Sequence, residues 1–172
     1  ALKHYDEAIA DYEKAIAIDP SQKAIVAHYL ETALSLRYPP IPSGSVVKGS
    51  WQPGNHFLAI DNAKGTSDIL VALAPRGSKG AQLAVYVAKG FSHTFEQAVP
   101  PGPYDIYITF GQRWDITTRS FAKEGGYLKW ELPQYFQGSP RQGYTMTFID
   151  YRAIPAGWSY TLSPISKDQF PV

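Results

Sequence analysis

Tyr104-Asp105-Ile106-Tyr107-Ile108-Thr109-Phe110 is the stretch that most clearly decides the fold of this chain. Apolar and polar side chains alternate along it, and a period of two places successive side chains on opposite faces of a β-strand. Pro100-Pro101-Gly102 comes just before it and supplies turn chemistry. The stretch therefore predicts a strand that begins after a turn.

Runs of the same kind fill the chain on both sides of this stretch. They cover residues 57–60, 69–73, 83–87, 91–99, 114–121, 127–132, 144–148 and 158–162. Segments with Gly, Pro or Asn separate them at 61–65, 75–77, 124–126 and 137–140. Short strands at this spacing, with no helical period between them, predict a mainly β fold. We expect an antiparallel β-sandwich of jelly-roll or immunoglobulin-like type, with a closed barrel as the alternative.

The chain changes character at Tyr38-Pro39-Pro40-Ile41-Pro42-Ser43-Gly44. Before this segment the sequence is charged and has a helical period, and after it the strand pattern begins. Consecutive prolines favour an extended, stiff connection. We therefore expect a helical hairpin at 1–38, a linker at 39–45 and the β domain at 46–172.

Two amphipathic helices are predicted before the linker. Apolar side chains follow a spacing of three and four residues, first at Ala8, Ile9, Tyr12, Ala15, Ile16 and Ile18 and then at Ile25, Val26, Tyr29, Leu30, Ala33 and Leu34. Asp19-Pro20 ends the first helix, because proline excludes the residue before it from the helical region. Ser21 is the expected N-cap of the second helix.

The run from Tyr5 to Pro20 resembles the second helix of a tetratricopeptide repeat. In that motif small residues, here Ala8 and Ala15, let the paired helix approach closely, while Tyr5 and Tyr12 fill the gaps and Pro20 ends the repeat. The resemblance covers only about 20 residues, and the first helix of the repeat is missing. It implies that residues 21–37 form a capping helix. We also expect the chain to be a fragment, because Ala1 stands inside the helical pattern.

The strand region resembles a little-studied bacterial β domain found behind zinc ribbons, membrane anchors or tetratricopeptide arrays. The resemblance rests on Pro101-Gly102-Pro103-Tyr104, on Gly111-Gln112-Arg113-Trp114-Asp115 and on the closing Gln169-Phe170-Pro171. Pro103 departs from the family pattern, in which tyrosine follows the glycine more directly. The resemblance implies a β fold and a bacterial envelope or extracellular setting, and it implies no activity.

Trp114-Asp115 is the most individual candidate site. The favoured interpretation is structural: Asp115 accepts hydrogen bonds from backbone amides and fixes a tight turn after Gly111, and Trp114 seals the edge of the core. The alternative is a carbohydrate or peptide platform, on which Trp114 stacks against a ligand and Asp115 accepts its hydroxyl hydrogen bonds. Tyr86 and Tyr107, together with Tyr151 and Tyr160, would extend it if they converge on an outer face. Trp51, Trp130 and Trp158 are expected in the core.

Composition and motifs favour binding over catalysis. The net charge of +1 gives no bulk attraction to nucleic acid, and the absence of cysteine excludes thiolate chemistry. His4, His28, His56 and His93 are too scattered to predict a metal site. Residues 76–80 lack the spacing of a phosphate loop, no serine-hydrolase elbow is present, and no apolar run is long enough to span a membrane. Asp105, Asp115, Glu124 and Glu131 are the carboxylates that a glycosidase-like pair would need.

The sequence thus predicts a non-catalytic module for protein interaction or self-association, without cofactor or metal. Open sheet edges and a lone helix pair both invite partners. Two alternatives stay open: a carbohydrate-binding accessory module, and a hydrolase built on a jelly roll.

Overall fold

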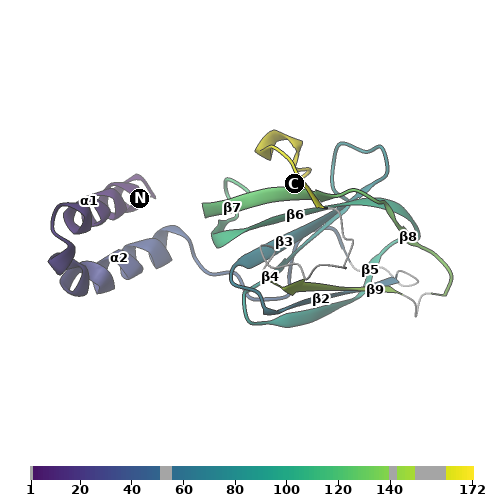
Figure 1. Cartoon of the computed structure of the whole chain (residues 1–172), viewed down its shortest axis with the longest axis horizontal. Helices are drawn as coiled ribbons and strands as arrows, with labels where there is room; N and C mark the ends of the chain where they lie inside the picture. Colours follow the sequence, from purple (N-terminus) through teal and green to yellow (C-terminus); the bar gives the residue numbers. More distant parts are fainter. Residues whose placement is uncertain (1, 51–55, 140–142, 150–161) are drawn as a thin grey trace.

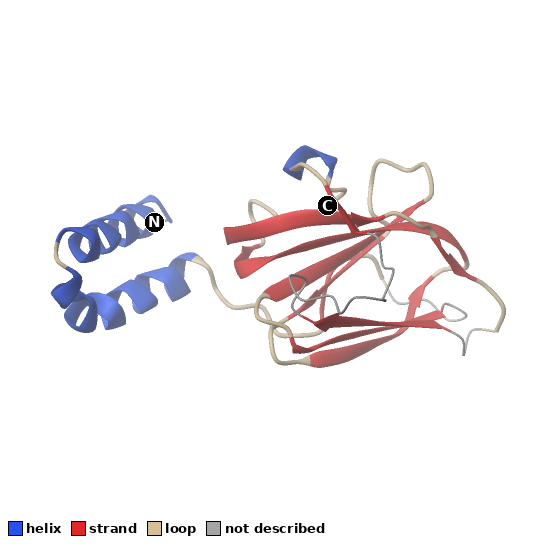
Figure 2. Cartoon of the chain, viewed as in Figure 1, coloured by secondary structure: helices blue, strands red, loops and turns tan. Residues whose placement is uncertain are grey.

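The computed structural model describes residues 2–50, 56–139, 143–149 and 162–172. In these residues a helical hairpin is followed by sheets in which most strands pair antiparallel, so the predicted mainly β class with N-terminal helices is confirmed (Figure 2). The helical elements are α1 (Leu2–Ile18), η1 (Pro20–Gln22), α2 (Lys23–Arg37) and η2 (Lys167–Gln169). The strands are β1 (Ser45–Lys48), β2 (His56–Lys64), β3 (Asp68–Pro75), β4 (Leu83–Val87), β5 (Ser92–Val99), β6 (Gly102–Asp115), β7 (Ser120–Trp130), β8 (Gln134–Phe136), β9 (Gly143–Ile149) and β10 (Leu162–Pro164).

The turn between the helices differs from the expected one in its capping residue. α1 ends at Ile18, as the Asp19-Pro20 pair predicts. Gln22, rather than Ser21, stands at the N-cap of α2 and makes no side-chain capping hydrogen bond. Asp19 instead caps η1: its carboxylate accepts hydrogen bonds from the Ser21 amide at 3.0 Å and from the Ser21 hydroxyl at 2.7 Å. Those hydrogen bonds lower the pKa of Asp19. Pro20 opens a single 3-10 turn, so α2 begins at Lys23, one residue later than an N-cap at Ser21 predicts.

The strands form two sheets that lie one above the other (Figure 1). The larger sheet has the order β1-β4-β3-β6-β7-β10, with β8 also paired to β6. The smaller sheet has the order β5-β2-β9. β6 is the longest strand and pairs with β3, β7 and β8, so the stretch with the clearest alternation lies in the middle of the larger sheet.

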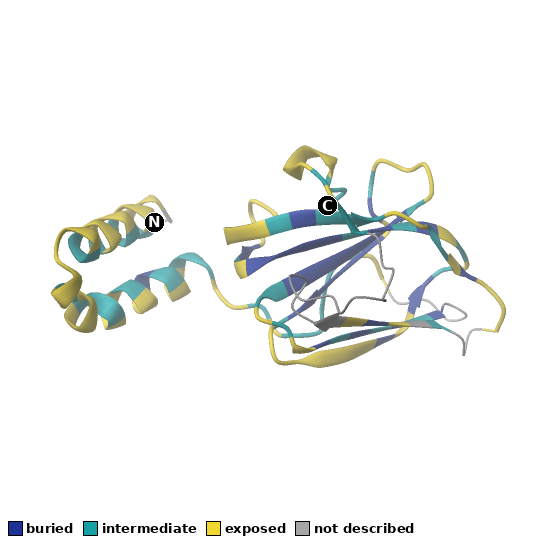
Figure 3. Cartoon of the chain, viewed as in Figure 1, coloured by how far each residue is buried: buried dark blue, intermediate teal, exposed yellow. Residues whose placement is uncertain are grey.

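The main apolar cluster lies between the two sheets. Alternate residues of β6, namely Tyr104, Ile106, Ile108 and Phe110, point into it, and Leu58 and Phe95 enter it from the smaller sheet. β3 and β4 of the larger sheet are therefore dark with buried residues in Figure 3, whereas much of β5 and most of the helices are exposed or half-buried. Burial of alternate residues, as in β2, is what the period of two predicts, whereas β3 and β4 are buried on both faces.

A second apolar cluster covers the opposite face of the larger sheet. It contains Leu70, Tyr86, Trp114 and Phe121, with Phe170 and Val172 from the C-terminal segment packed against them. The backbone amide of Ala81 donates a hydrogen bond to the carbonyl of Pro171 at 2.9 Å. The Phe170-Pro171 ending therefore covers the outer face of the larger sheet.

Two predicted boundaries around β6 and β7 are wrong. Residues 114–121 do not form one strand, because Trp114 and Asp115 end β6 and Ser120 begins β7. Glu124-Gly125-Gly126 is not a turn but lies inside β7, at a shift in the register with β6. The ring of Phe110 lies against both glycines and leaves no space for a side chain there. Glycine here permits close packing between strands rather than a reversal of the chain.

The expectation of purely antiparallel pairing is also wrong at one place. β9 runs parallel to β2, with Leu58 opposite Tyr144 and Ile60 opposite Met146. Parallel neighbours need a long connection, and here β3 to β8 lie between the two strands in the chain. The alternation of apolar and polar residues within a strand does not show whether a partner so distant in the sequence runs parallel or antiparallel to it.

Candidate interaction surface

The helical hairpin exposes large apolar side chains along one side of α2. Ile25 is 64% exposed, Tyr29 57% and Leu36 52%, and Ile18 at the end of α1 is 75% exposed. With Thr32, the residues of α2 stand at positions 25, 29, 32 and 36, which is the spacing of one continuous stripe along a helix. We call Ile25, Tyr29, Thr32 and Leu36 the α2 stripe.

Thr32 does not interrupt the apolar character of the α2 stripe. Its hydroxyl donates a hydrogen bond to the carbonyl of His28 in the preceding turn, at 2.8 Å. A hydroxyl satisfied in this way has less need of water. The stripe was not singled out from the sequence, although its spacing was readable there. The apolar residues of α2 occupy both sides of the helix, and the sequence does not show which side faces α1.

The predicted helix-packing residues lie on the half-buried side of α1. Tyr5, Ala8, Tyr12 and Ala15 are all half-buried, and the ring of Tyr12 stacks at 6.3 Å from that of Tyr29. On α2, Ala33 is the buried residue of the hairpin within the described part of the chain. Pro20 is exposed at the start of η1.

Charged side chains connect the hairpin to the turn between β6 and β7. The guanidinium of Arg37, at the end of α2, contacts Asp6 of α1 at 2.6 Å and Asp115 of β6 at 3.1 Å. Arg113 of β6 pairs with Glu31 of α2. The Arg37 and Asp115 side chains are only 13% and 7% exposed, so water screens this pair weakly.

Asp115 also holds the turn that follows β6. Its carboxylate accepts hydrogen bonds from the amide of Thr117 at 2.8 Å and from that of Thr118 at 3.4 Å. Burial acts to raise the pKa of Asp115, but these amides and Arg37 outweigh it and the pKa is lowered. The turn thus lies after Asp115 itself, rather than directly after Gly111.

The aromatic side chains proposed as a ligand platform are largely enclosed. Trp114 is 3% exposed and packs edge-on against Phe121, and Tyr86 is buried. Burial and the nearby Asp68 raise the pKa of Tyr86. Tyr107 is half-buried between Phe170 and the ammonium of Lys129, which lies 5.3 Å from the ring centre. A sugar ring needs an open aromatic face, and Trp114 and Tyr86 present none in this conformation.

The other candidate residues have partners of their own or lie outside the description. Asp105 pairs with Lys129 at 3.2 Å, Glu124 pairs with Lys167, and Glu131 accepts a hydrogen bond from Ser163. Trp130 packs partly against the main apolar cluster. Trp51, Tyr151, Trp158 and Tyr160 lie outside the described residues.

Two further observations concern the described residues as a set. Within them, no three His, Asp or Glu side chains are grouped so that they could hold a metal ion. None of the helices described has the length and apolar character that a membrane crossing requires.

Comparisons with protein-family models, with curated proteins and with solved structures found no match to this chain.

Proposed function

We propose that this chain is a non-catalytic module for protein assembly, and that the α2 stripe is the surface through which it acts. The observation that carries this proposal is the exposure of Ile25, Tyr29 and Leu36 on one side of one helix. Apolar side chains at this spacing fit into the grooves of another helix. The partner is therefore an amphipathic helix, as expected of a hairpin of tetratricopeptide type. The β domain, a sandwich of jelly-roll or immunoglobulin-like type in this proposal, carries the hairpin.

A second copy of the chain is the partner that suits the stripe best. If two α2 helices pack antiparallel about a two-fold axis, Ile25 of each copy meets Leu36 of the other, and Tyr29 meets Thr32. The same contact is then made twice, which is the form of a self-complementary dimer interface. Burial of these side chains removes exposed apolar surface of the hairpin from water.

Sedimentation velocity over a dilution series tests this proposal. We expect concentration-dependent dimers, and we expect the double variant Ile25→Glu, Leu36→Glu to stay monomeric because it places charges in the contact. The matched control is Phe91→Glu, Leu132→Glu. These two residues are 58% and 69% exposed but lie on loops of the β domain, so dimerisation should be unchanged.

Two results would contradict the proposal. One is a wild-type chain that stays monomeric up to the highest concentration reached. The other is a dimer that the control variant abolishes and the stripe variant preserves, because the interface would then lie on the β domain.

A further inference from the structure

The hairpin and the β domain meet through charges rather than through an apolar interface. Neither apolar cluster of the described residues contains a side chain from α1 or α2. The ion pairs described between the two parts are Arg37 with Asp115 and Arg113 with Glu31. Figure 1 shows the hairpin extending from one end of the sheets, joined to them by the linker. An orientation held by few apolar contacts depends on those charges.

Arg37 ties three elements together at this junction. Its guanidinium is shared between Asp6 of α1 and Asp115 of β6, and the hydrogen bond to Asp6 raises the pKa of Arg37. Asp115 is nearly buried and also caps its own turn, so its carboxylate is held in place by the β domain as well as by Arg37. A fixed carboxylate facing a weakly screened cation holds one orientation more firmly than two mobile surface charges would.

Arg113 provides a second, more exposed tie. Its backbone has a φ of 60°, in the left-handed region that residues other than glycine rarely adopt. Arg113 belongs to β6, and it adopts this conformation at the position from which its side chain pairs with Glu31 of α2. Local backbone strain of this kind persists where the surrounding structure requires it.

The linker leaves only a short pivot between the two parts. Gly44 already pairs with the carbonyl of Tyr86, and the hydroxyl of Ser43 accepts a hydrogen bond from the amide of Ala88. Ile41 packs against the second apolar cluster. The residues between α2 and this anchor are Tyr38, Pro39 and Pro40. A change in the orientation of the hairpin relative to the β domain therefore depends on rotations in about three residues. Two of these are prolines, whose φ is restricted.

We propose that the Arg37–Asp115 and Arg113–Glu31 pairs form a charge-dependent latch, which sets the direction of the helical hairpin and opens while both parts stay folded. The latch goes beyond the proposed assembly function, because it acts within one chain and needs no partner. Its effect is to fix where the α2 stripe points relative to the β domain. A change of charge at Glu31 redirects that surface.

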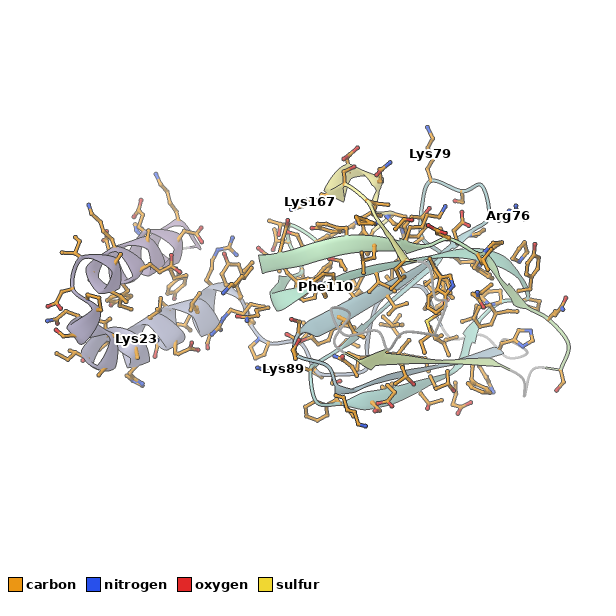
Figure 4. The ribbon with its side chains drawn as sticks, in the orientation of Figure 1. Lys23, Arg76, Lys79, Lys89, Phe110 and Lys167 are labelled. Atoms are coloured by element: carbon orange, nitrogen blue, oxygen red, sulfur yellow. The ribbon has the colours of Figure 1, made fainter. Side chains whose placement is uncertain are left out.

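Distance measurements between two spin labels test the latch. The sequence has no cysteine, so Lys14→Cys on α1 and Lys79→Cys after β3 give one labelled pair on exposed sites, and Lys79 projects away from the sheets (Figure 4). Mixing the labelled chain with an excess of unlabelled chain removes distances between labels on different copies. We expect one narrow distance distribution for the parent chain and a broad one for Glu31→Arg and for Arg37→Gln.

The charge swap and a control make the test specific. Glu31→Arg combined with Arg113→Glu restores attraction, so the narrow distribution should return. Lys167→Glu places a second carboxylate beside Glu124, and both positions belong to the β domain. This variant should therefore leave the distance distribution narrow. The far-ultraviolet circular dichroism of every variant should keep its helical signal.

Three outcomes would overturn the proposal. The first is a distribution that stays narrow in both Glu31→Arg and Arg37→Gln, because the charges would then not set the orientation. The second is a swap that fails to narrow it again. The third is loss of the helical signal when the pairs are removed, because the pairs would then be needed for folding of the hairpin and not only for its direction.

Discussion

Trp114 and Phe121 face each other across β6 and β7, with ring centres 5.1 Å apart and ring planes at 76°. They stand on either side of the turn that Asp115 caps and close the end of the second apolar cluster. The ring contact connects the β6–β7 turn with the packing on the outer face of the larger sheet, because burial of either ring requires that β6 and β7 are paired.

Removal of the Trp114 ring should be strongly destabilising. Trp114→Ala leaves a cavity beside Phe121 and should lower the free energy of unfolding by about 3–5 kcal/mol, measured by urea denaturation. Trp114→Phe should cost much less, because it keeps an aromatic contact and removes an indole N–H that has no hydrogen-bond partner among the described residues. Equal losses in the two variants would show that the ring contact contributes little.

Gly111 should tolerate no side chain. A Cβ there would lie 2.6 Å from the Cβ of Phe121, in a strand that is paired on both sides. Gly111→Ala should therefore lower the free energy of unfolding by about 1–3 kcal/mol. Gly80→Ala is the control, because a Cβ at Gly80 meets open space and should change the stability by less than about 0.5 kcal/mol. Thermal unfolding of both variants measures the difference.

The C-terminal segment should stabilise the outer face of the larger sheet. Phe170 packs against the rings of Tyr107 and Tyr127, at 6.4 Å and 5.4 Å between ring centres. Phe170→Ala should cost about 1–3 kcal/mol and should increase the binding of a dye that reports exposed apolar surface. Phe91→Ala removes a ring that is already exposed, and an equally large effect there would contradict this role for Phe170.

Stability should depend on the ionised form of Asp115 in acid. The pKa of its carboxyl is lowered from 3.8 in the folded chain, so the folded state favours the ionised form. Its contribution is fully present above the unfolded pKa and is lost as the pH falls through the folded pKa. Between about pH 5 and pH 3, the wild type should therefore lose more stability than Asp115→Asn does.

Urea titrations at several pH values measure this difference. Other carboxylates with lowered pKa values, Asp19, Asp61 and Glu124, add to the acid sensitivity of both proteins and cancel in the comparison. Parallel curves for the wild type and Asp115→Asn would show that the charge of Asp115 makes no net contribution.

The sequence by itself determined the local elements of this protein. The period of two in residues 104–110 places a strand with one face in the main apolar cluster, and Asp19-Pro20 ends α1 where expected. These features depend on side chains within a few residues of each other, so the sequence shows them directly. The turn predicted at Glu124-Gly125-Gly126 was wrong because glycine is compatible both with a turn and with a close contact to Phe110.

The tertiary structure decided which local elements meet. It paired β9 with β2 in parallel, covered Trp114 and Tyr86 with the second apolar cluster, and left the α2 stripe exposed. It also brought Arg37 to Asp115 across 78 positions of the sequence. The physical reason is that alternation shows that a face is apolar but not what will cover it. Likewise, a charged residue can pair with any residue of opposite charge, and only the packing of the folded chain determines which of them lies beside it.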